Sequence, residues 1–229
     1  MIDIHSHILP FVDDGCVSLE HSIQMLEKAI DQGVTDLILT PHYKRVFPTT
    51  PEQIKKEFES LNAEKNARNL PINLYLGHEI FMHKESTGLL LEDRLLTLNG
   101  TKYVLVEFKV REFSDIVERI YELVKAGYKP IVAHAERYNY FTIQDAQEVK
   151  ELGGYIQVNA GSIKGKQRKS WKKRVRKLFK YSLVDFVASD AHEHRDNVMK
   201  KAKRWVRLRY GKNVAEKVFI ENAKEIIKG

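Results

Sequence analysis

The chain has 229 residues, a length that suits one domain with a sizeable hydrophobic core. Hydrophobic residues make up 43% of it and charged residues 30%, a balance that excludes an intrinsically disordered protein. No apolar run approaches the roughly 18–20 residues that a membrane span requires, and the first residues lack the pattern of a signal peptide. The single cysteine, Cys16, excludes an internal disulfide. We therefore expect a cytoplasmic protein without membrane insertion.

Short β-branched apolar runs alternate with amphipathic segments along the chain. Most of these runs are apolar on both faces, which is typical of parallel strands covered by helices on both sides. Strand–helix alternation without a break predicts a parallel α/β barrel, one unit short of the eight-fold form, in a single domain of residues 1–229. The seven predicted strands span residues 2–5, 36–40, 73–77, 103–107, 130–134, 155–159 and 185–189.

Residues that start helices mark the segments between these strands. Ser18 begins an amphipathic segment, and residues 50–53 (Thr-Pro-Glu-Gln) form a capping box with proline at the first helical position. Ser114 and Thr142 precede two further helical segments. The pattern over residues 82–99 indicates only a short irregular helix. The remaining predicted helices span residues 115–126, 143–152, the basic segment within 164–180, 196–209 and 214–227.

Acidic and imidazole side chains follow the predicted strands at a consistent position. In a parallel barrel the carboxyl ends of all strands meet at one mouth, where barrel enzymes carry their active sites. One histidine pair or one glutamate at a strand end has an ordinary explanation, such as a surface ion pair. Five imidazoles and four carboxylates at one mouth would be very unfavourable without bound cations. The nine candidate metal ligands are His5, His7, Asp14, His42, Glu79, Glu107, His134, Asp190 and His192.

The donor set contains imidazole nitrogen and carboxylate oxygen but no thiolate. It suits manganese, iron or zinc, and magnesium less well because of the five imidazoles. Catalysis by a cysteine nucleophile that needs an arginine six residues further on is excluded, because Ser22 stands at that position. Cys16 also follows two aspartates, which do not lower the pKa of a thiol. The sequence therefore predicts metal-assisted rather than cysteine-based catalysis.

Basic residues are concentrated in two segments. Residues 164–180 contain ten lysines and arginines, residues 200–212 contain seven, and neither segment contains an acidic residue. Together they exceed the net charge of +7, so the rest of the chain is net acidic. The pattern predicts either an acidic partner for one face or two solvated helix faces. The first segment also carries an apolar stripe that we expect to pack on the barrel: Trp171, Val175, Leu178 and Phe179.

Several short blocks of sequence carry a family resemblance. Residues 1–10 read Met-Ile-Asp-Ile-His-Ser-His-Ile-Leu-Pro, and Val-Asp-Asp-Gly follows at 12–15. Later blocks lie at 40–43 (Thr-Pro-His-Tyr), 77–80 (Gly-His-Glu-Ile), 134–138 (His-Ala-Glu-Arg-Tyr), 157–161 (Gln-Val-Asn-Ala-Gly) and 189–192 (Ser-Asp-Ala-His).

Over residues 1–195 these blocks resemble the PHP-family (polymerase and histidinol phosphatase) phosphoesterases. They are most similar to the manganese-dependent protein-tyrosine phosphatases of Gram-positive capsule and exopolysaccharide operons. The sequence departs from the family pattern at Phe11, where glycine is usual, and at Ala135 and His78. The resemblance implies a distorted (β/α)7 TIM-like barrel, the PHP fold, which agrees with the seven predicted strands.

The resemblance also implies a site for three metal ions, with Mn²⁺ as the expected ion. Three divalent cations would leave the centre with a net positive charge, which favours a dianionic phosphate group. A water molecule activated by the metals would act as the nucleophile. The implied ligand sets are His5, His7, Glu79 and Asp190 for the first ion, Glu79, Glu107 and His134 for the second, and Asp14, His42 and His192 for the third.

The remaining site residues concern the substrate. Arg137 matches the family arginine that binds phosphate, and Arg195 is the nearby candidate for a second one. Asp14, His42 and a metal-bound water are the candidates for assisting proton transfer. Tyr138 belongs to an aromatic cluster that either stacks on a phosphotyrosine ring or packs within its loop. The implied substrate is a phosphotyrosine protein, namely a bacterial tyrosine kinase that regulates capsule or exopolysaccharide synthesis.

Three other functions fit part of the pattern. A small-molecule phosphatase, such as histidinol-phosphate phosphatase, shares the metal ligands. A nucleic-acid-processing PHP domain would use the basic segments, but the sequence shows no nucleic-acid-binding motif and no interleaving of basic and aromatic residues, so nucleic acid is not the expected partner. A non-catalytic binding module would be expected to have lost some of the ligands.

Overall fold

The computed structural model describes residues 1–44, 46–47, 49–195 and 197–228. Within this part of the chain, every ladder between named strands is parallel. The strands are β1 (Ile2–Asp3), β2 (Asp36–Leu39), β3 (His42–Tyr43), β4 (Asn73–Leu76), β5 (Glu79–Phe81), β6 (Tyr103–Glu107), β7 (Lys129–Val132), β8 (Tyr155–Asn159) and β9 (Phe186–Ala188).

The strands form two sheets that join into one ring. One sheet has the order β1-β2-β4 and the other the order β3-β5-β6-β7-β8-β9. The chain passes from β2 into β3 and from β4 into β5 after short breaks, so these two segments enter both sheets. A parallel bridge between Ser6 and Ala191 joins the first strand to the last, and the N–H of His7 donates to the carbonyl of Ala191 at 2.9 Å. This ring is the predicted distorted (β/α)7 TIM-like barrel.

The two breaks have local causes and decide where functional side chains lie. Pro41 has no N–H to donate to a ladder, so β2 ends before it. At Gly77 a Cβ atom would lie 2.7 Å from Cδ2 of Leu98, and glycine avoids this clash. Beyond the breaks, His42 of β3 pairs in register with Glu79 of β5. Two predicted ligands from different strands are thereby placed side by side.

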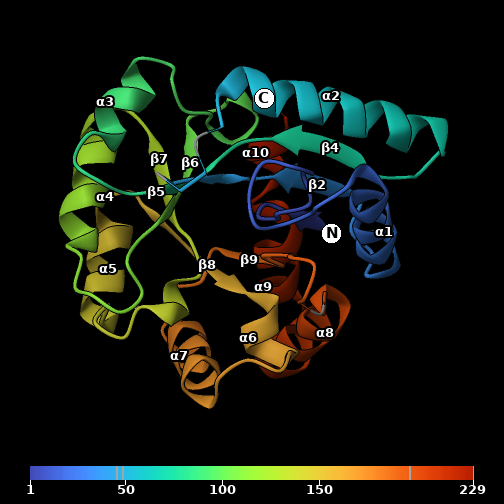
Figure 1. The fold of residues 1–229 in the computed structure, drawn as a ribbon. Coiled ribbons are helices and arrows are strands. Elements are labelled where there is room, and N and C mark those ends of the chain that lie inside the picture. The colour runs from blue at the N-terminus through green and yellow to red at the C-terminus, as the bar shows by residue number, and fades with distance from the viewer. Residues whose placement is uncertain (45, 48, 196, 229) are drawn as a thin grey trace.

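The helices surround the barrel. Figure 1 shows α2 on one side, α7 on the opposite side, and α4 and α5 along the flank between them. The helix bounds are α1 (Leu19–Asp31), α2 (Pro51–Ala67), α3 (Ser86–Leu91), α4 (Ile116–Lys125), α5 (Ile143–Glu151), α6 (Ala160–Lys164), α7 (Lys169–Lys180), α8 (Met199–Tyr210), α9 (Lys212–Glu216) and α10 (Lys224–Ile227), with 3-10 turns η1 (Leu98–Gly100) and η2 (Ala135–Arg137) and a π-helical turn η3 (Lys217–Glu221).

Capping residues explain most of the helix starts. The Ser18 hydroxyl caps α1, and Thr50 with Gln53 forms the predicted capping box of α2. The predicted start at Ser114 is wrong by one residue. Asp115 is the cap of α4, because its carboxylate accepts the N–H of the third helical residue at 3.1 Å.

The C-terminal part of the chain departs further from the prediction. The short helix α6 was not predicted, and the helix predicted over 214–227 is divided into α9, η3 and α10. Val218 and Phe219 in η3 and Ile226 in α10 are all buried, so the wider π-helical turn directs apolar side chains before and after it onto the barrel. The helix predicted from 196 begins at Met199, and residue 196 lies outside the described residues.

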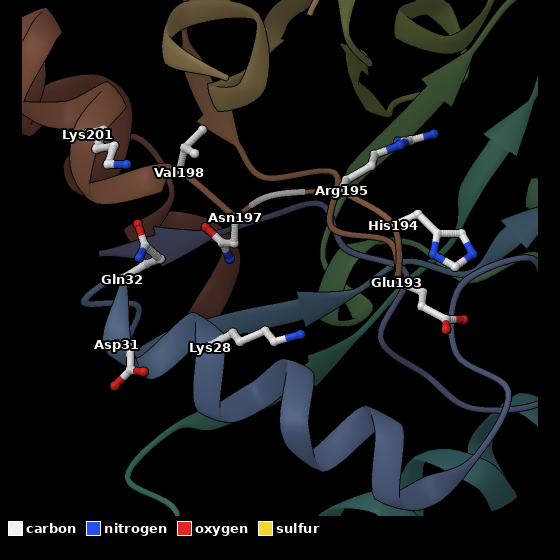
Figure 2. A pocket seen from close by; sticks show the side chains of 9 residues that line it. All are labelled: Lys28, Asp31, Gln32, Glu193, His194, Arg195, Asn197, Val198 and Lys201. Carbon is white, nitrogen blue, oxygen red and sulfur yellow. The ribbon is translucent and has the colours of Figure 1, made fainter. Parts of the chain in front are cut away.

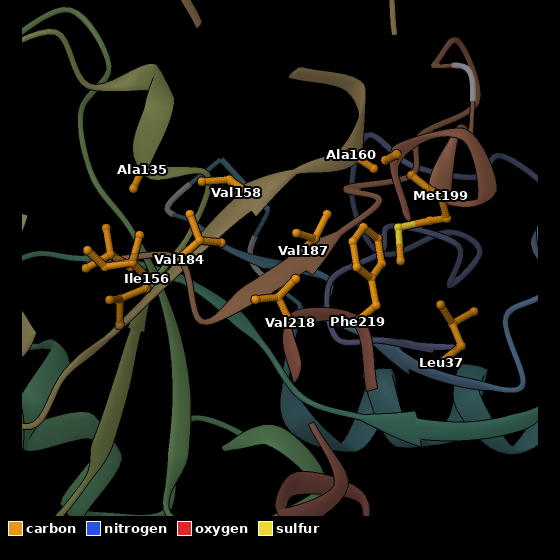
Figure 3. Packing of buried hydrophobic residues seen from close by; sticks show 14 of the residues in the cluster. Leu37, Ala135, Ile156, Val158, Ala160, Val184, Val187, Met199, Val218 and Phe219 are labelled. Atoms are coloured by element: carbon orange, nitrogen blue, oxygen red, sulfur yellow. The ribbon is translucent and has the colours of Figure 1, made fainter. Parts of the chain in front are cut away.

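Two hydrophobic clusters fill the molecule. The smaller one contains Ile4, Leu105 and Ile131, which are among the inward-facing side chains of the barrel. The larger one contains side chains from the opposite face of the strands together with those of the helices. Figure 3 shows part of it, where Val187 of β9 lies beside Phe219. The alternation of strand residues between the two clusters explains why the predicted strands are apolar on both faces.

The basic segment folds largely as predicted. In α7, Val175, Leu178 and Phe179 are buried, and Trp171 is half-buried. The exposed residues of this helix include Lys169, Lys173, Arg176 and Lys180, whereas Lys172 is half-buried. No helix in the described ranges is long and apolar enough to cross a membrane.

Candidate metal centre

All nine predicted ligands lie together at the carboxyl ends of the barrel strands. Eight of them are buried, and Asp14 is exposed, with 56% of its side chain accessible. Their positions follow directly from the strands: His5 and His7 lie after β1, His42 in β3, Glu79 in β5, Glu107 at the end of β6, His134 after β7, and Asp190 and His192 after β9.

The loop that carries Asp14 is folded tightly against His7. A Cβ atom at Gly15 would lie 1.9 Å from the carbonyl oxygen of His7, so this position requires glycine. Asp13 accepts the N–H groups of Gly15 at 2.9 Å and of His42 at 3.0 Å. Its Oδ2 also lies 2.6 Å from Nδ1 of His7. Asp13 therefore fixes both the loop and the His7 ring, and leaves Nε2 of that ring for the centre.

Two candidate ligands have a strained backbone. His134 has a φ of 32° and Asp190 a φ of 50°, in the left-handed region that residues other than glycine rarely adopt. Such a conformation costs on the order of 1–3 kcal/mol and persists where surrounding contacts impose it. The N–H of His134 donates to Oε1 of Gln157 at 2.8 Å, and the N–H of Asp190 donates to the carbonyl of His5 at 3.0 Å. Strain of this kind concentrates at functional sites.

Glu79 is at the middle of the cluster. Its Oε1 lies 2.8 Å from Nε2 of His134 and 3.3 Å from Nε2 of His5. Its Oε2 lies 2.6 Å from Nδ1 of His42 and 3.4 Å from Nε2 of His7. One carboxylate thus faces four imidazoles, which is the arrangement expected of a bridging ligand.

The ligands form three groups. Within each group the donor atoms lie within 4.8 Å of one another, close enough to share one cation. One contains the three residues that the resemblance assigns to the third ion together with His7, and another contains three of the four residues assigned to the first ion. The third combines Glu79 and Glu107 with His42 in place of His134, although Nε2 of His134 also lies 3.5 Å from Oε1 of Glu107. The groups are His7, Asp14, His42 and His192; His5, His7 and Asp190; and His42, Glu79 and Glu107.

Several donor atoms have no hydrogen-bond partner among the described residues, although they are buried. They are Oε2 of Glu79, Nδ1 of His42 and Nε2 of His192. Buried polar atoms without partners are rare in folded proteins, because each loses its hydration without compensation. The short approach of His42 to Glu79 lacks the angle of a hydrogen bond. These atoms fit divalent cations as their common partner.

The carboxylates have shifted pKa values. Burial alone would raise the pKa of Glu79, but His5 and His42 hold it well below the usual range. Against the same effect of burial, Arg137 holds the pKa of Asp190 well below its usual range. Burial and the nearby charge of Glu79 raise the pKa of Glu107. Two carboxylates that disfavour each other's ionisation are a further sign that the site suits an added positive charge.

Two polar side chains of β8, to which no role was assigned from the sequence, contact the ligands through hydrogen bonds. Oε1 of Gln157 lies 3.2 Å from Nδ1 of His5, and its amide donates to Oδ1 of Asn159 at 2.8 Å. Asn159 in turn donates to Oδ2 of Asp190 at 2.7 Å. The signal for this pair was the presence of two polar residues at alternate positions of one apolar strand, which places both on the same face of β8.

Three cations border the ligands. Arg137 donates to Oδ2 of Asp190, and Nη1 of Arg195 lies 2.7 Å from the same oxygen. Both arginines predicted from the sequence are therefore at the centre. Lys44 was not predicted, although its Nζ lies 2.5 Å from Oε2 of Glu107 and 3.2 Å from Nε2 of His42. Its place two residues after a ligand was the only signal in the sequence.

A surface pocket of about 520 Å³ adjoins the centre through Arg195. It lies between α1 and the segment that joins β9 to α8, and side chains of both signs line it. Figure 2 shows the Arg195 side chain directed away from Lys28 and Lys201. Arg195 therefore connects the buried ligands with the surface, consistent with the 35% exposure of its side chain.

Tyr138 does not lie where a substrate ring would stack on it. Its side chain is completely buried, and its hydroxyl lies 3.2 Å from Nδ1 of His134 and accepts the N–H of Phe108 at 3.1 Å. The predicted substrate contact is corrected accordingly. Tyr138 packs within the protein because the turn η2 directs its ring inward, where it orients the imidazole of His134.

Residues 1–228 match the family described as capsular polysaccharide synthesis, CpsB/CapC. The chain belongs to the CpsB/CapC family. It is 35% identical over 239 aligned positions to the tyrosine-protein phosphatase CpsB of Streptococcus agalactiae, covering 100% of this chain and 98% of that protein. It is also 35% identical to the tyrosine-protein phosphatase YwqE of Bacillus subtilis over 196 positions, which cover 84% of this chain and 77% of YwqE.

Solved structures agree with this membership. A chain from the crystal structures of YwqE from Bacillus subtilis and CpsB from Streptococcus pneumoniae, described as unique metal-dependent tyrosine phosphatases, superposes with a TM-score of 0.88. It is 32% identical, and the match covers 94% of this CpsB/CapC chain and 90% of that one. The lactonase Lmo2620 from Listeria monocytogenes, at 13% identity and a TM-score of 0.63, shares the fold alone. This CpsB/CapC chain is thus an enzyme of the metal-dependent phosphatase class.

Proposed function

We propose that residues 1–229 form one domain that is a manganese-dependent protein-tyrosine phosphatase. Its substrate is a phosphotyrosine protein, a bacterial tyrosine kinase that regulates capsule or exopolysaccharide synthesis. The observation that carries this proposal is the convergence of the donor groups with Arg137 and Arg195 on Asp190. Metal ligands and guanidinium groups in direct contact are the combination that a phosphomonoester dianion requires.

The three donor groups define where divalent ions would be held. Ions at these positions would supply Lewis acidity and a water of lowered pKa for attack on phosphorus. Nitrogen and oxygen donors without thiolate suit Mn²⁺, with Fe, Zn or Mg as other ions of compatible coordination chemistry. The contact with His192, whose Nε2 lies 3.5 Å from Oδ1 of Asp14, lowers the pKa of Asp14 and keeps this carboxylate ionised at neutral pH. Asp14 therefore serves as a ligand or proton acceptor and not as the acid that protonates the leaving group.

Arg137 and Arg195 would bind the phosphate. Both guanidinium groups now neutralise one carboxylate, Asp190. An arginine has five N–H donors in a planar fork, and it can turn these donors from the carboxylate to phosphate oxygens. Lys44 adds a third cation to the ligand cluster, against Glu107. Charge stabilisation of this kind supplies most of the catalysis in phosphoryl transfer.

A direct experiment compares substrates on the same metal-loaded protein. The proposal predicts rapid release of phosphate from a phosphotyrosyl peptide and much slower release from histidinol phosphate. A tyrosine leaving group, whose pKa is about 10, needs less protonation than an alkyl alcohol. Faster hydrolysis of histidinol phosphate would contradict the proposal and would indicate a small-molecule phosphatase instead. Absence of hydrolysis with either substrate would leave a metal-binding module.

A further inference from the structure

The basic helix α7 reaches the metal centre through one aromatic side chain, Trp171. The guanidinium carbon of Arg137 lies 5.4 Å from the centroid of the Trp171 ring. That of Arg168, which precedes the helix, lies 5.3 Å from the same centroid. Helix α7 also contacts the turn η2, on which Arg137 stands. The Trp171 indole therefore contacts both the guanidinium of Arg137, which belongs to the metal centre, and that of Arg168, which belongs to the basic surface.

We propose that Trp171 is the positioning residue for Arg137 in phosphate binding, and that Arg174, one helical turn further on, fixes the loop behind it. This inference rests on the proposed function, because it assigns Arg137 to the phosphate. It adds to the site an element, helix α7, that otherwise belongs to the charged surface.

The contact suits this role because an arginine that lies over an aromatic ring keeps its hydrogen-bond donors. A cation–π contact uses the face of the guanidinium plane, whereas hydrogen bonds to phosphate leave from its edge. The Arg137 side chain is 12% exposed, and its Nε is buried without a hydrogen-bond partner among the described residues. Its charged end is held by Asp190 on one side and by Trp171 on another. Trp171 can therefore keep the group in place while phosphate replaces Asp190 as its partner.

Arg174 acts on the backbone that follows Arg137. Its Nη2 donates to the carbonyl of Tyr138 at 2.6 Å and also to the carbonyl of Phe141, and Nη1 donates to the carbonyl of Asn139 at 3.5 Å. Burial lowers the pKa of this guanidinium, and the three carbonyl contacts compensate for the lost hydration. A surface arginine would show no such set of backbone acceptors. The first turns of α7 thus hold both the side chain of Arg137 and the loop after it.

A double-mutant cycle tests the proposal. We expect Trp171→Ala to raise the KM for a phosphotyrosyl peptide about 3- to 30-fold, the range of a partly desolvated cation–π contact, with little change in kcat. Trp171→Phe should recover most of the loss. Arg168→Ala removes the other cation from the same ring and should change KM less than about 2-fold. In an Arg137→Ala background Trp171→Ala should have almost no further effect. An undiminished effect in that background, with an unchanged midpoint of thermal unfolding, would overturn the proposal.

A second readout does not depend on turnover. The chain has two tryptophans, so in a Trp205→Phe variant the selectively excited tryptophan fluorescence reports on Trp171 alone. Inorganic phosphate added to the metal-loaded variant should change the Trp171 emission, because the charge beside the ring changes when phosphate replaces Asp190 as the partner of Arg137. The change should disappear with Arg137→Ala and persist with Arg168→Ala. A response that survives Arg137→Ala would overturn the role of Trp171. A normal phosphate response in a protein that hydrolyses no phosphotyrosine would instead refute the proposed function alone.

Discussion

The metal centre and the basic surface of α7 and α8 are both crowded with charge, and they differ in burial. In the centre, imidazoles, carboxylates and three cations lie within hydrogen-bond distance of one another and mostly out of water. On the basic surface, the exposed lysines and arginines of residues 164–180 and 200–212 are solvated. One groove of this surface is lined by Lys173, Arg176, Lys177, Lys180, Leu208, Arg209 and Tyr210, without a carboxylate.

The difference predicts how strongly each region responds to substitution. Buried charges interact in a low dielectric, so removal of one leaves its partners uncompensated. Exposed charges are screened by salt over about 8–10 Å and act mainly on the rate of encounter with a charged partner. Substitutions in the centre should therefore change catalysis by orders of magnitude, and substitutions on the basic surface by small factors that depend on salt.

The largest effect is expected from the ligands themselves. His42→Ala and Asp190→Ala should each reduce kcat by about 10³-fold or more, because each removes a donor from a group that holds a cation. Bound metal per chain, measured by elemental analysis, should fall in parallel. His83→Ala, an exposed histidine that pairs with Glu85 and belongs to none of the three groups, is the matched control. Near-normal turnover in His42→Ala would break the distinction between the two regions.

Arg137 should have the next largest effect. A charge-assisted hydrogen bond to phosphate contributes roughly 1.5–3 kcal/mol, so Arg137→Ala should lower kcat/KM about 10- to 150-fold. Metal content should not change, since Arg137 contacts a ligand but is not one. Arg94→Ala, which removes an exposed arginine on the surface, should leave kcat/KM unaltered. Equal rates for Arg137→Ala and wild type would place Arg137 outside the reaction.

The basic surface should give a smaller effect that depends on substrate. Lys173→Glu with Lys177→Glu should raise the KM for an acidic, multiply phosphorylated peptide about 3- to 10-fold at low salt, and the defect should shrink as salt rises. Hydrolysis of a small aryl phosphate should stay near the wild-type rate. The same charge change on α2, Lys55→Glu with Lys56→Glu, is the control on another face. No loss on either substrate would make the basic surface a solvated face only.

Cys16 should give the smallest effect. Burial raises the pKa of its thiol to about 11, so at pH 7–8 almost all of it is protonated. Alkylating reagents should react slowly with the folded protein, and faster as the pH rises toward this pKa or after unfolding. Cys16→Ser should keep turnover within a few-fold. Rapid inactivation by alkylation at neutral pH, without unfolding, would point to a cysteine nucleophile.

The strand ends were the most predictable part of the molecule. Eight of the nine ligands lie at or shortly after the end of an apolar run, Asp14 lies in the loop after the first run, and the parallel arrangement of the runs places all carboxyl ends together. The breaks at Pro41 and Gly77 were not predicted, although they divide two strands between two sheets. A local kink depends on what lies opposite it, here the close approach of Leu98 to Gly77, and that is absent from the local pattern.

Side-chain direction was the least predictable feature. Tyr138 follows Arg137 in sequence, yet its ring points into the protein toward His134 while the guanidinium points to Asp190. Trp171 was expected to pack as part of a stripe, and the contact with Arg137, 34 positions earlier, depends on how α7 lies against η2. Sequence spacing identifies a face of an element, but it does not say which side chain lies opposite.

The central claim is that one metal cluster supplies the activity. Metal-free protein, titrated with Mn²⁺ while hydrolysis of a phosphotyrosyl peptide is followed, tests it most directly. The structure predicts no turnover without metal and a rise that saturates near three ions per chain, one for each donor group. Full turnover in protein shown by elemental analysis to contain no divalent metal would contradict the account.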